Sequence, residues 1–210
     1  FGIVQGGTSE RLRRQAAQAI ASLGFPGYAI GGLSVGETKE DMYAVAALTA
    51  SLLPRECPRH LMGVGSPEDL VQCVSRGVDL FDCVLPTRVA RNGGLFTSQG
   101  RVNITNSRFR DMDRPLQEEC DCYTCQTFSA AYLHHLFKAQ ELLAYRLTTI
   151  HNLRFLLRLM EEMRQSIVEG SIKEYTNAFL ANYRPASEKV RVEERGRWAM
   201  TRKRKFQTLE

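Results

Sequence analysis

The chain has 210 residues, of which 43% are hydrophobic and 24% are charged, a balance typical of a soluble globular protein with a sizeable core. No stretch approaches the roughly 18 uninterrupted apolar residues of a membrane span, so we expect a cytoplasmic protein with no membrane partner. The net charge of +5 arises in residues 184–210, a basic tail that can hold a phosphate backbone or simply be a solvated terminus. Phe1 opens directly in an apolar run, and we expect the N-terminus to be truncated.

Apolar runs alternate with helix signals over the first 93 residues. Strands are predicted at 1–5, 27–30, 60–64 and 78–85, and helices at 9–23, 38–53 and 66–76. Ser9, Thr38 and Ser66 are the expected N-caps. Strands separated by helices predict parallel pairing with right-handed crossovers. An open doubly wound sheet and half of a (β/α)8 barrel both fit this pattern.

The alternation stops after residue 93. A hairpin is predicted at 94–104, a cysteine cluster follows at 120–125, and residues 127–168 are predicted to be helical with a break near Thr148 and Thr149. Residues 171–183 predict one more short helix.

Three of the six cysteines, Cys120, Cys122 and Cys125, lie within six residues. Thiolates this close repel one another unless a cation holds them, and zinc prefers four tetrahedral nitrogen or sulfur ligands. Candidates for the fourth ligand are His60, His134, His135 and His151; the spacing favours His151 but does not exclude the others. Three unrelated reduced cysteines are the alternative. A Cys3His set leaves no open position for water, so the predicted zinc is structural.

Glycines follow three of the predicted strands, in Gln5-Gly6-Gly7, Gly31-Gly32-Leu33 and Gly63-Val64-Gly65. Strand ends of parallel sheets carry active sites, and glycine lets a flat ligand lie against the backbone. The amide of Gln5 offers a donor and an acceptor, which suits the edge of a nucleobase. Tight turns between elements are the alternative reading.

Asp82 stands within the apolar run 81–85, where a carboxylate is costly unless it is paired or used. General acid–base work and nucleophilic attack are its two main uses, and carboxylates are suitable nucleophiles at a sugar anomeric carbon. A structural aspartate bonded to the backbone or to an arginine is the alternative.

The chain resembles the bacterial tRNA-guanine transglycosylases from Phe1 to about Tyr183. The segments that carry the resemblance are 2–6, 27–37, 61–65, 81–91, 119–125 and 149–153. It implies a (β/α)8 barrel with an inserted zinc-binding subdomain. Residues 1–93 would then be the second half of the barrel, 94–153 the hairpin and zinc subdomain, 154–183 C-terminal helices and 184–210 the basic tail.

The resemblance also implies the site residues. Asp82 falls on the nucleophile, Gln5, Gly32 and Leu33 on contacts to the base, Arg88 and Arg91 on the segment that grips the anticodon loop around U-G-U, and Cys120, Cys122, Cys125 and His151 on the zinc ligands.

The implied reaction exchanges the wobble guanine of tRNA for 7-aminomethyl-7-deazaguanine (preQ1) through a covalent bond between Asp82 and ribose. Val35 matches the bacterial pattern, whereas the eukaryotic pattern has glycine there for the bulkier queuine. A homodimer is implied as well. The general base would lie in the absent first half, so we expect this fragment alone to lack full activity.

Three other interpretations fit the sequence less well. A non-catalytic subunit of the same family would lack the nucleophile, whereas Asp82 is present. An archaeal-type relative fits the bacterial match less well. A zinc-knuckle RNA-binding module leaves the glycine turns without a purpose.

Overall fold

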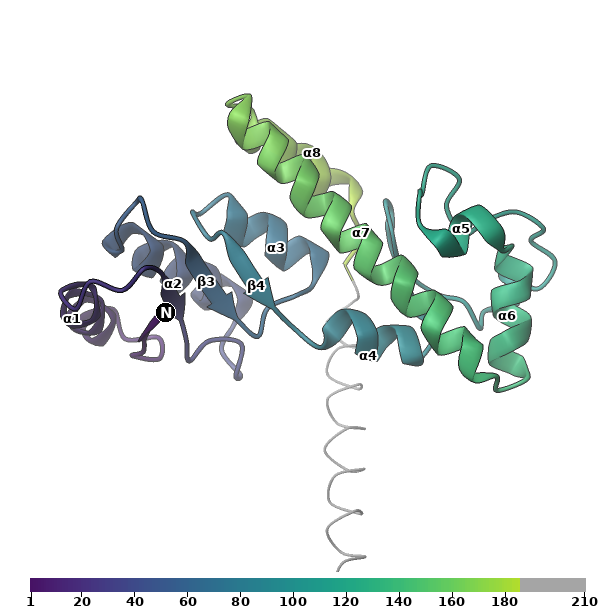
Figure 1. Cartoon of the computed structure of the whole chain (residues 1–210), viewed down its shortest axis with the longest axis horizontal. Helices are drawn as coiled ribbons and strands as arrows, with labels where there is room; N and C mark the ends of the chain where they lie inside the picture. The colour runs from purple at the N-terminus through teal and green to yellow at the C-terminus, as the bar shows by residue number, and fades with distance from the viewer. Residues whose placement is uncertain (186–210) are drawn as a thin grey trace, which may run out of the picture.

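A four-stranded parallel sheet forms the first part of the computed structural model, which describes residues 1–185 (Figure 1). Its strands, in spatial order, are β1 (Gly2–Val4), β2 (Tyr28–Ile30), β3 (Arg59–Met62) and β4 (Leu80–Asp82). The connecting helices are α1 (Glu10–Ala21), α2 (Lys39–Leu52) and α3 (Pro67–Val74). The predicted alternation and parallel pairing are confirmed.

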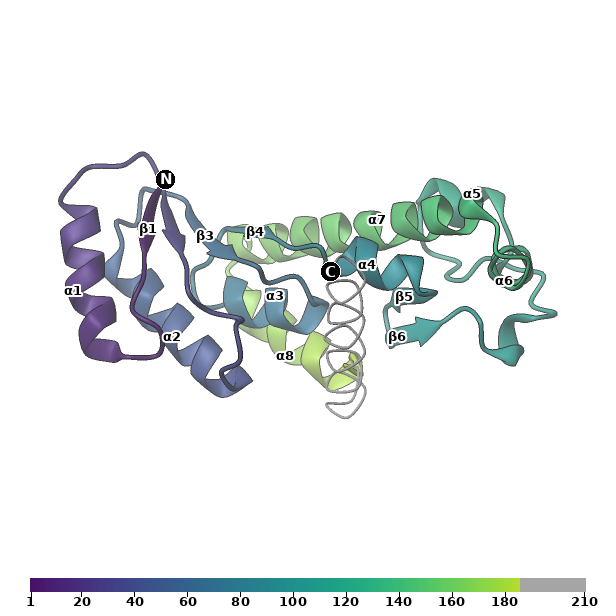
Figure 2. The same ribbon diagram turned by 90° about the horizontal axis from the view of Figure 1, so that it is seen from below.

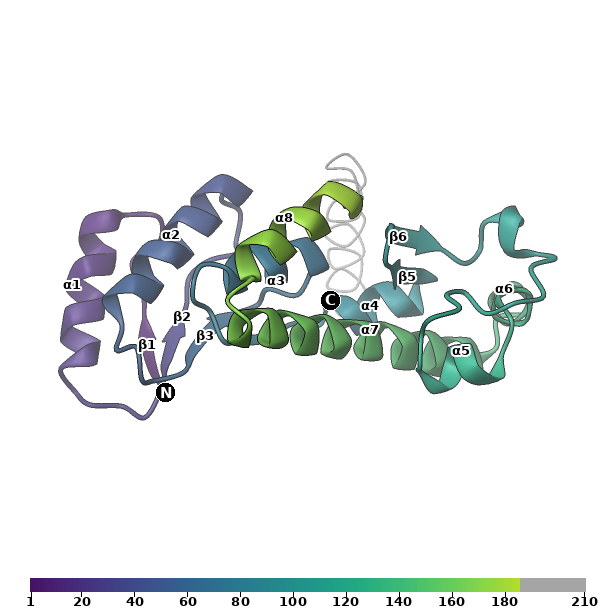
Figure 3. The ribbon, with the colours of Figure 1, turned by 90° about the horizontal axis from the view of Figure 1, so that it is seen from above.

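Helices α1, α2 and α3 all lie on one face of this sheet (Figure 2 and Figure 3). The strands follow one another in chain order, so each right-handed crossover steps in the same direction and lands on the same face. A doubly wound sheet carries helices on both faces instead. The core under the helices includes Val4, Ile30, Leu61, Met42 and Ala46. Ile3, Met62 and Leu80 are exposed on strands of the same sheet.

Local capping explains where these helices begin. The Ser9 hydroxyl accepts a hydrogen bond from the Leu12 N–H, and the Thr38 hydroxyl accepts one from the Asp41 N–H, as expected for N-caps. Ser66 makes no such bond, although it precedes α3 and is followed by Pro67. The start of α3 therefore rests on the proline in its first turn and on the acids at its positive end.

The predicted strand at 78–85 is wrong in its second half. Strand β4 ends at Asp82, and helix α4 (Leu85–Arg91) begins three residues later. Pro86 lies in the first turn of α4, where the absent N–H has no helical partner in any case. Asp82 consequently stands at the end of a strand with a side chain 62% exposed, and not inside a buried apolar run.

The second part of the described chain contains the predicted hairpin, β5 (Gly94–Thr97) paired antiparallel with β6 (Gly100–Asn103). It is followed by the short helices η1 (Ser107–Phe109), α5 (Tyr123–Thr127) and α6 (Ala130–Lys138), then by α7 (Leu142–Val168) and α8 (Ile172–Asn182). The predicted short helix at 171–183 is confirmed.

The predicted helix break near Thr148 is wrong, because α7 runs through it without interruption. The Thr148 hydroxyl is buried and donates to the Ala144 carbonyl, 2.7 Å away, which satisfies the polar group inside the helix. The actual break lies between α6 and α7, where Gln140 has a φ of 59°. His151 therefore lies well inside α7 and does not begin a helix.

Helix α7 connects the two parts of the described chain (Figure 1). It packs against α4, β5, α5 and α6. The buried Asn152 amide donates to the carbonyls of Pro86 and Gly94, at 3.0 and 2.9 Å, and accepts from the Phe96 N–H at 3.0 Å. One side chain thus ties α4 and β5 to α7.

The described chain ends just beyond α8. The Arg184 N–H donates to the Gln99 carbonyl, 3.1 Å away, beside the β5–β6 turn. Residues 186–210, which make up most of the predicted basic tail, lie outside the described residues. No helix within 1–185 has the length and apolarity that a membrane crossing demands.

Candidate active site and metal centre

The sheet register brings Gln5 and Asp82 to one level. Asp82 pairs with Met62, Leu61 pairs with Ile30, and Ile30 pairs with Val4. The residues that follow Val4, Ile30 and Leu61 are Gln5, Gly31 and Met62. Together with Asp82 they form a row at the carboxyl ends of the strands. Side chains alternate between the faces of a strand, so this row shares one face. That edge is where parallel β/α proteins bind their ligands.

The side chain of Gln5 lies against Gly31 and Gly32. A Cβ atom at Gly31 would be 2.5 Å from Gln5 Nε2, and one at Gly32 would be 2.5 Å from Gln5 Oε1. Gly32 also has a φ of +66°, which favours glycine. Gln5 and Gly32 thus lie together, whereas the Leu33 side chain is buried in the core. Leu33 can offer a ligand only its backbone.

Arg13 holds the ends of β1 and β2 from inside, a feature that the sequence did not indicate. Its side chain is fully buried and donates to the carbonyls of Val4, Gly7 and Gly31 at 3.1, 2.8 and 2.8 Å. Burial lowers the pKa of the guanidinium, and the negative charge of Glu37 acts in the opposite direction. The carbonyl bonds fix the loop that carries Gln5 relative to the Gly31–Gly32 turn.

Glu37 fixes the neighbouring turn. Its carboxylate accepts hydrogen bonds from the backbone N–H groups of Ser34, Val35 and Gly36, and Ser34 has a φ of 60°. Burial works against the charge, but the backbone N–H of Glu37 itself, followed by those of Ser34, Val35 and Gly36, holds the pKa of Glu37 below its ordinary value. The turn presents Val35, 82% exposed, at its tip.

Asp82 is held by two neighbours but is not enclosed. Its Oδ1 accepts a hydrogen bond from the Gly63 N–H at 3.3 Å and lies 2.9 Å from His60 Nε2. With 62% of the side chain exposed, the carboxylate can reach a ligand beside the glycine turn. The sequence suggests His60 only as a candidate metal ligand. Its contact with Asp82 joins residues 22 positions apart, and no local pattern indicates it.

A cavity of about 310 Å³ lies next to this site but does not include it. Its mostly apolar lining includes Leu80, Cys83, Leu156 and Met160, from β4, the segment after it and α7. Burial raises the pKa of the Cys83 thiol. Neither Asp82 nor Gln5 lines the cavity, so it is distinct from the candidate base site.

Arg88 and Arg91 lie in the last turn of α4, directly after the strand that carries Asp82. Both residues are exposed. Asn152 ties the backbone of α4 to α7 through the Pro86 carbonyl.

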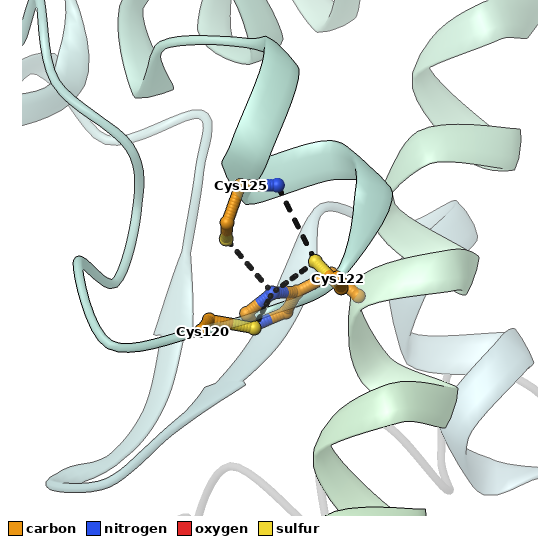
Figure 4. A group of neighbouring side chains, drawn as sticks. Cys120, Cys122 and Cys125 are labelled. Carbon is orange, nitrogen blue, oxygen red and sulfur yellow. Dashed lines mark hydrogen bonds between the residues drawn. The ribbon is translucent and has the colours of Figure 1, made fainter.

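Cys120, Cys122, Cys125 and His151 form a buried cluster whose ligand atoms all lie within 4.8 Å of one another (Figure 4). The three sulfur atoms are 3.7, 3.6 and 3.3 Å from His151 Nδ1. A tetrahedral zinc ion with ordinary bond lengths requires sulfur–nitrogen distances of about 3.6 Å. The four side chains therefore have the composition and spacing to hold a metal ion.

The other histidine candidates lie outside this cluster. His60 contacts Asp82, His134 Nδ1 is 2.8 Å from the Ile104 carbonyl, and His135 is exposed. His151 Nε2 lies 2.7 Å from the Phe96 carbonyl. A proton on Nε2 satisfies that carbonyl and leaves the Nδ1 lone pair facing the thiols, as is usual for a metal-binding histidine.

The thiols of the cluster share their protons. Hydrogen bonds with Cys122 and Cys125 lower the pKa of Cys120 far below its usual range, and the same kind of contact raises the pKa of Cys125. A thiolate is thus stabilised by protons on its neighbours. A divalent cation can take the place of those protons, so the electrostatics of the cluster fit a metal as well as its geometry does.

The chain is similar in sequence to known proteins over most of its length. The chain matches the model of one protein family, described as queuine tRNA-ribosyltransferase, over residues 1–185. It is 54% identical over 202 residues to the queuine tRNA-ribosyltransferase of Dehalococcoides mccartyi (strain CBDB1). The alignment covers 96% of this chain and 52% of the relative. The protein of the same name from Staphylococcus aureus (strain bovine RF122 / ET3-1) is 57% identical over 183 residues. That alignment covers 87% of this chain and 48% of the relative. The chain spans about half the length of these curated relatives.

Proposed function

The chain belongs to the queuine tRNA-ribosyltransferase family, and from this membership we propose that it is the nucleophile-bearing part of a tRNA-guanine transglycosylase. The observation that carries the proposal is the position of Asp82. Its exposed carboxylate stands at the end of β4, on the same row and face as Gln5 and Gly31. A base held against Gln5 and Gly31 therefore lies on the same edge as a group able to attack its ribose.

We propose that the four-stranded sheet is half of a (β/α)8 barrel. Chain-order strands and helices on a single face support this, as does the length of the relatives. The exposed Ile3 and Leu80 would then face the interior of the closed barrel. Residues 94–153 would include the inserted zinc subdomain and 154–183 the C-terminal helices, with α7 (Leu142–Val168) running through the boundary between them. Without the complementary half the pocket is incomplete, and the chain alone lacks full activity.

The reaction is a double displacement. The wobble guanosine of a U-G-U anticodon is flipped out of the loop towards the sheet edge. A carboxylate oxygen of Asp82 bonds to ribose C1′ as the C1′–N9 bond breaks, and guanine leaves with the bonding electrons. The incoming base, deprotonated at N9 by a general base outside this chain, bonds to C1′ and releases Asp82 as a carboxylate.

Recognition is divided between the two turns and α4. The Gln5 amide and the backbone of Gly32 and Leu33 read the base edge, and Arg88 and Arg91 bind the anticodon loop. Val35, at the tip of its turn, limits the space available to a substituent. We therefore favour preQ1, with its small aminomethyl group, over queuine. The enzyme works in the cytoplasm, where tRNA is found, as a homodimer.

The metal is Zn²⁺, held by Cys120, Cys122, Cys125 and His151. Four protein ligands fill a tetrahedral shell, so the ion is structural and leaves no position for a reacting water. When bound, the ion would stabilise the segment around α5 by connecting it to α7 through His151. The bond of His151 to the Phe96 carbonyl extends this connection to the hairpin.

The proposal is tested with a fusion of this chain to the complementary half of the Dehalococcoides mccartyi relative. Labelled preQ1 is offered together with a U-G-U tRNA, and a tRNA with adenine at the wobble position is the control. We expect incorporation into the first tRNA only, and much less when the chain is used alone. Binding of the U-G-U tRNA without incorporation would favour the non-catalytic subunit, the second candidate from this family.

A further inference from the structure

His60 contacts the same oxygen of Asp82 as the backbone does. Its Nε2 atom lies 2.9 Å from Oδ1, and the Gly63 N–H donates to Oδ1 at 3.3 Å. Within residues 1–185, Oδ2 has no hydrogen-bond partner. One carboxylate oxygen is therefore anchored by two contacts, while the side chain as a whole remains 62% exposed.

The surroundings of His60 leave Asp82 as its polar partner. In the sheet His60 pairs with Ala29 on one side and Leu80 on the other, both apolar. The imidazole is 25% exposed, so it keeps one side towards solvent. His60 and Asp82 lie on the face of the sheet opposite the covering helices, where neither contributes to the core beneath them.

We propose that His60 is a positioning residue for the transglycosylation reaction, donating from Nε2 to Oδ1 so that Oδ2 of Asp82 faces ribose C1′. This inference rests on the proposed function. The two contacts restrict rotation of the carboxylate, which places the attacking oxygen before substrate arrives.

The same donor acts in the second step of the reaction. When the incoming base bonds to C1′, the C1′–Oδ2 bond breaks and its electrons return to Asp82. The carboxylate regains its charge at that moment, and a hydrogen bond to a charged oxygen is stronger than one to an ester carbonyl. His60 therefore orients the attacking oxygen in the first step and stabilises the released carboxylate in the second.

The test uses the fusion protein with His60→Gln, which keeps an N–H donor, and His60→Phe, which keeps a ring without one. Single-turnover formation of the covalent adduct is followed on a U-G-U stem-loop. We expect the Phe variant to be slower by roughly 10- to 100-fold and the Gln variant to recover most of the rate. The dissociation constant for the stem-loop and the zinc content should remain those of the wild type.

Each outcome has a separate meaning. Wild-type rates in the Phe variant, or equal losses in both variants, would overturn the role of His60 while leaving the proposed function intact. If the wild-type fusion forms no adduct, the proposed function itself fails. A second measurement leaves His60 unchanged: the Nε2 resonance in NMR spectra of this chain should shift in Asp82→Asn, and an unshifted resonance would contradict the contact.

Discussion

Replacing Gly32 by alanine should weaken base binding without an unusual loss of stability. At a φ of +66° an alanine costs about 1–2 kcal/mol. Its Cβ would also lie 2.5 Å from Gln5 Oε1, which is closer than real contacts allow. Gln5 is exposed, so its side chain can turn away at little cost to folding. A displaced Gln5 loses its contact to the base, worth about 1–3 kcal/mol or roughly 5- to 150-fold in affinity.

Gly24 offers a matched control, because its φ is +67° and a Cβ there would meet nothing within 4 Å. Urea unfolding of the chain should give equal stability losses for Gly24→Ala and Gly32→Ala. The Michaelis constant for preQ1 in the fusion should rise only for Gly32→Ala. Unchanged base binding in Gly32→Ala, or a stability loss several kcal/mol beyond that of Gly24→Ala, would refute the placement of Gln5 against this turn.

Three further predictions concern stability, pH and the metal. Asn152→Leu removes three buried hydrogen bonds to the backbone and should cost on the order of 3–6 kcal/mol in urea unfolding, whereas Asn182→Leu at an exposed position should cost little. Because the native pKa of Glu37 lies below 4.5, its hold on the Val35 turn should be complete above pH 4.5 and lost as the pH falls through the lower native value. Amide exchange of Val35 should follow that course, and a loosening already at pH 6 would contradict it. His151→Ala should abolish binding of one Zn²⁺ per chain while the exposed His135→Ala keeps it, and equal zinc contents would refute the cluster.

Local chemistry made much of the fold predictable. Ser9 and Thr38 are N-cap residues whose hydroxyls bond to the first turn of the helices that they precede, so each helix start is encoded within four residues. The same holds for the hairpin around Gly100 and for the three clustered cysteines, since a compact set of thiols has few uses other than holding a metal.

The missed elements depended on longer-range context. Pro86 ended a predicted strand, but a proline fits equally well in the first turn of a helix, and the choice of α4 relies on Asn152 binding its carbonyl from α7. Thr148 is a poor helix former whose hydroxyl is satisfied inside α7. The real break falls at Gln140, which has no sequence signal for a positive φ.

The unforeseen parts of the candidate site are contacts between distant segments. His60 on β3 contacts Asp82 on the neighbouring strand β4, and Arg13 donates to the Gly31 carbonyl from α1. Nothing local distinguishes Arg13 from the exposed Arg14 beside it. The sequence supplied the residue types, whereas only the register of the parallel strands specified which of them meet.

The central claim is that Asp82 forms a covalent bond to ribose, and trapping that bond tests it most directly. The fusion is incubated with a labelled U-G-U stem-loop, quenched in denaturant and run on a denaturing gel. We predict a protein–RNA band in the wild type and no band in Asp82→Asn. Asp79→Asn is the control and should keep the band, because Asp79 directly precedes β4 and its carboxylate accepts from the Arg59 N–H. A band of undiminished intensity in Asp82→Asn would contradict the account.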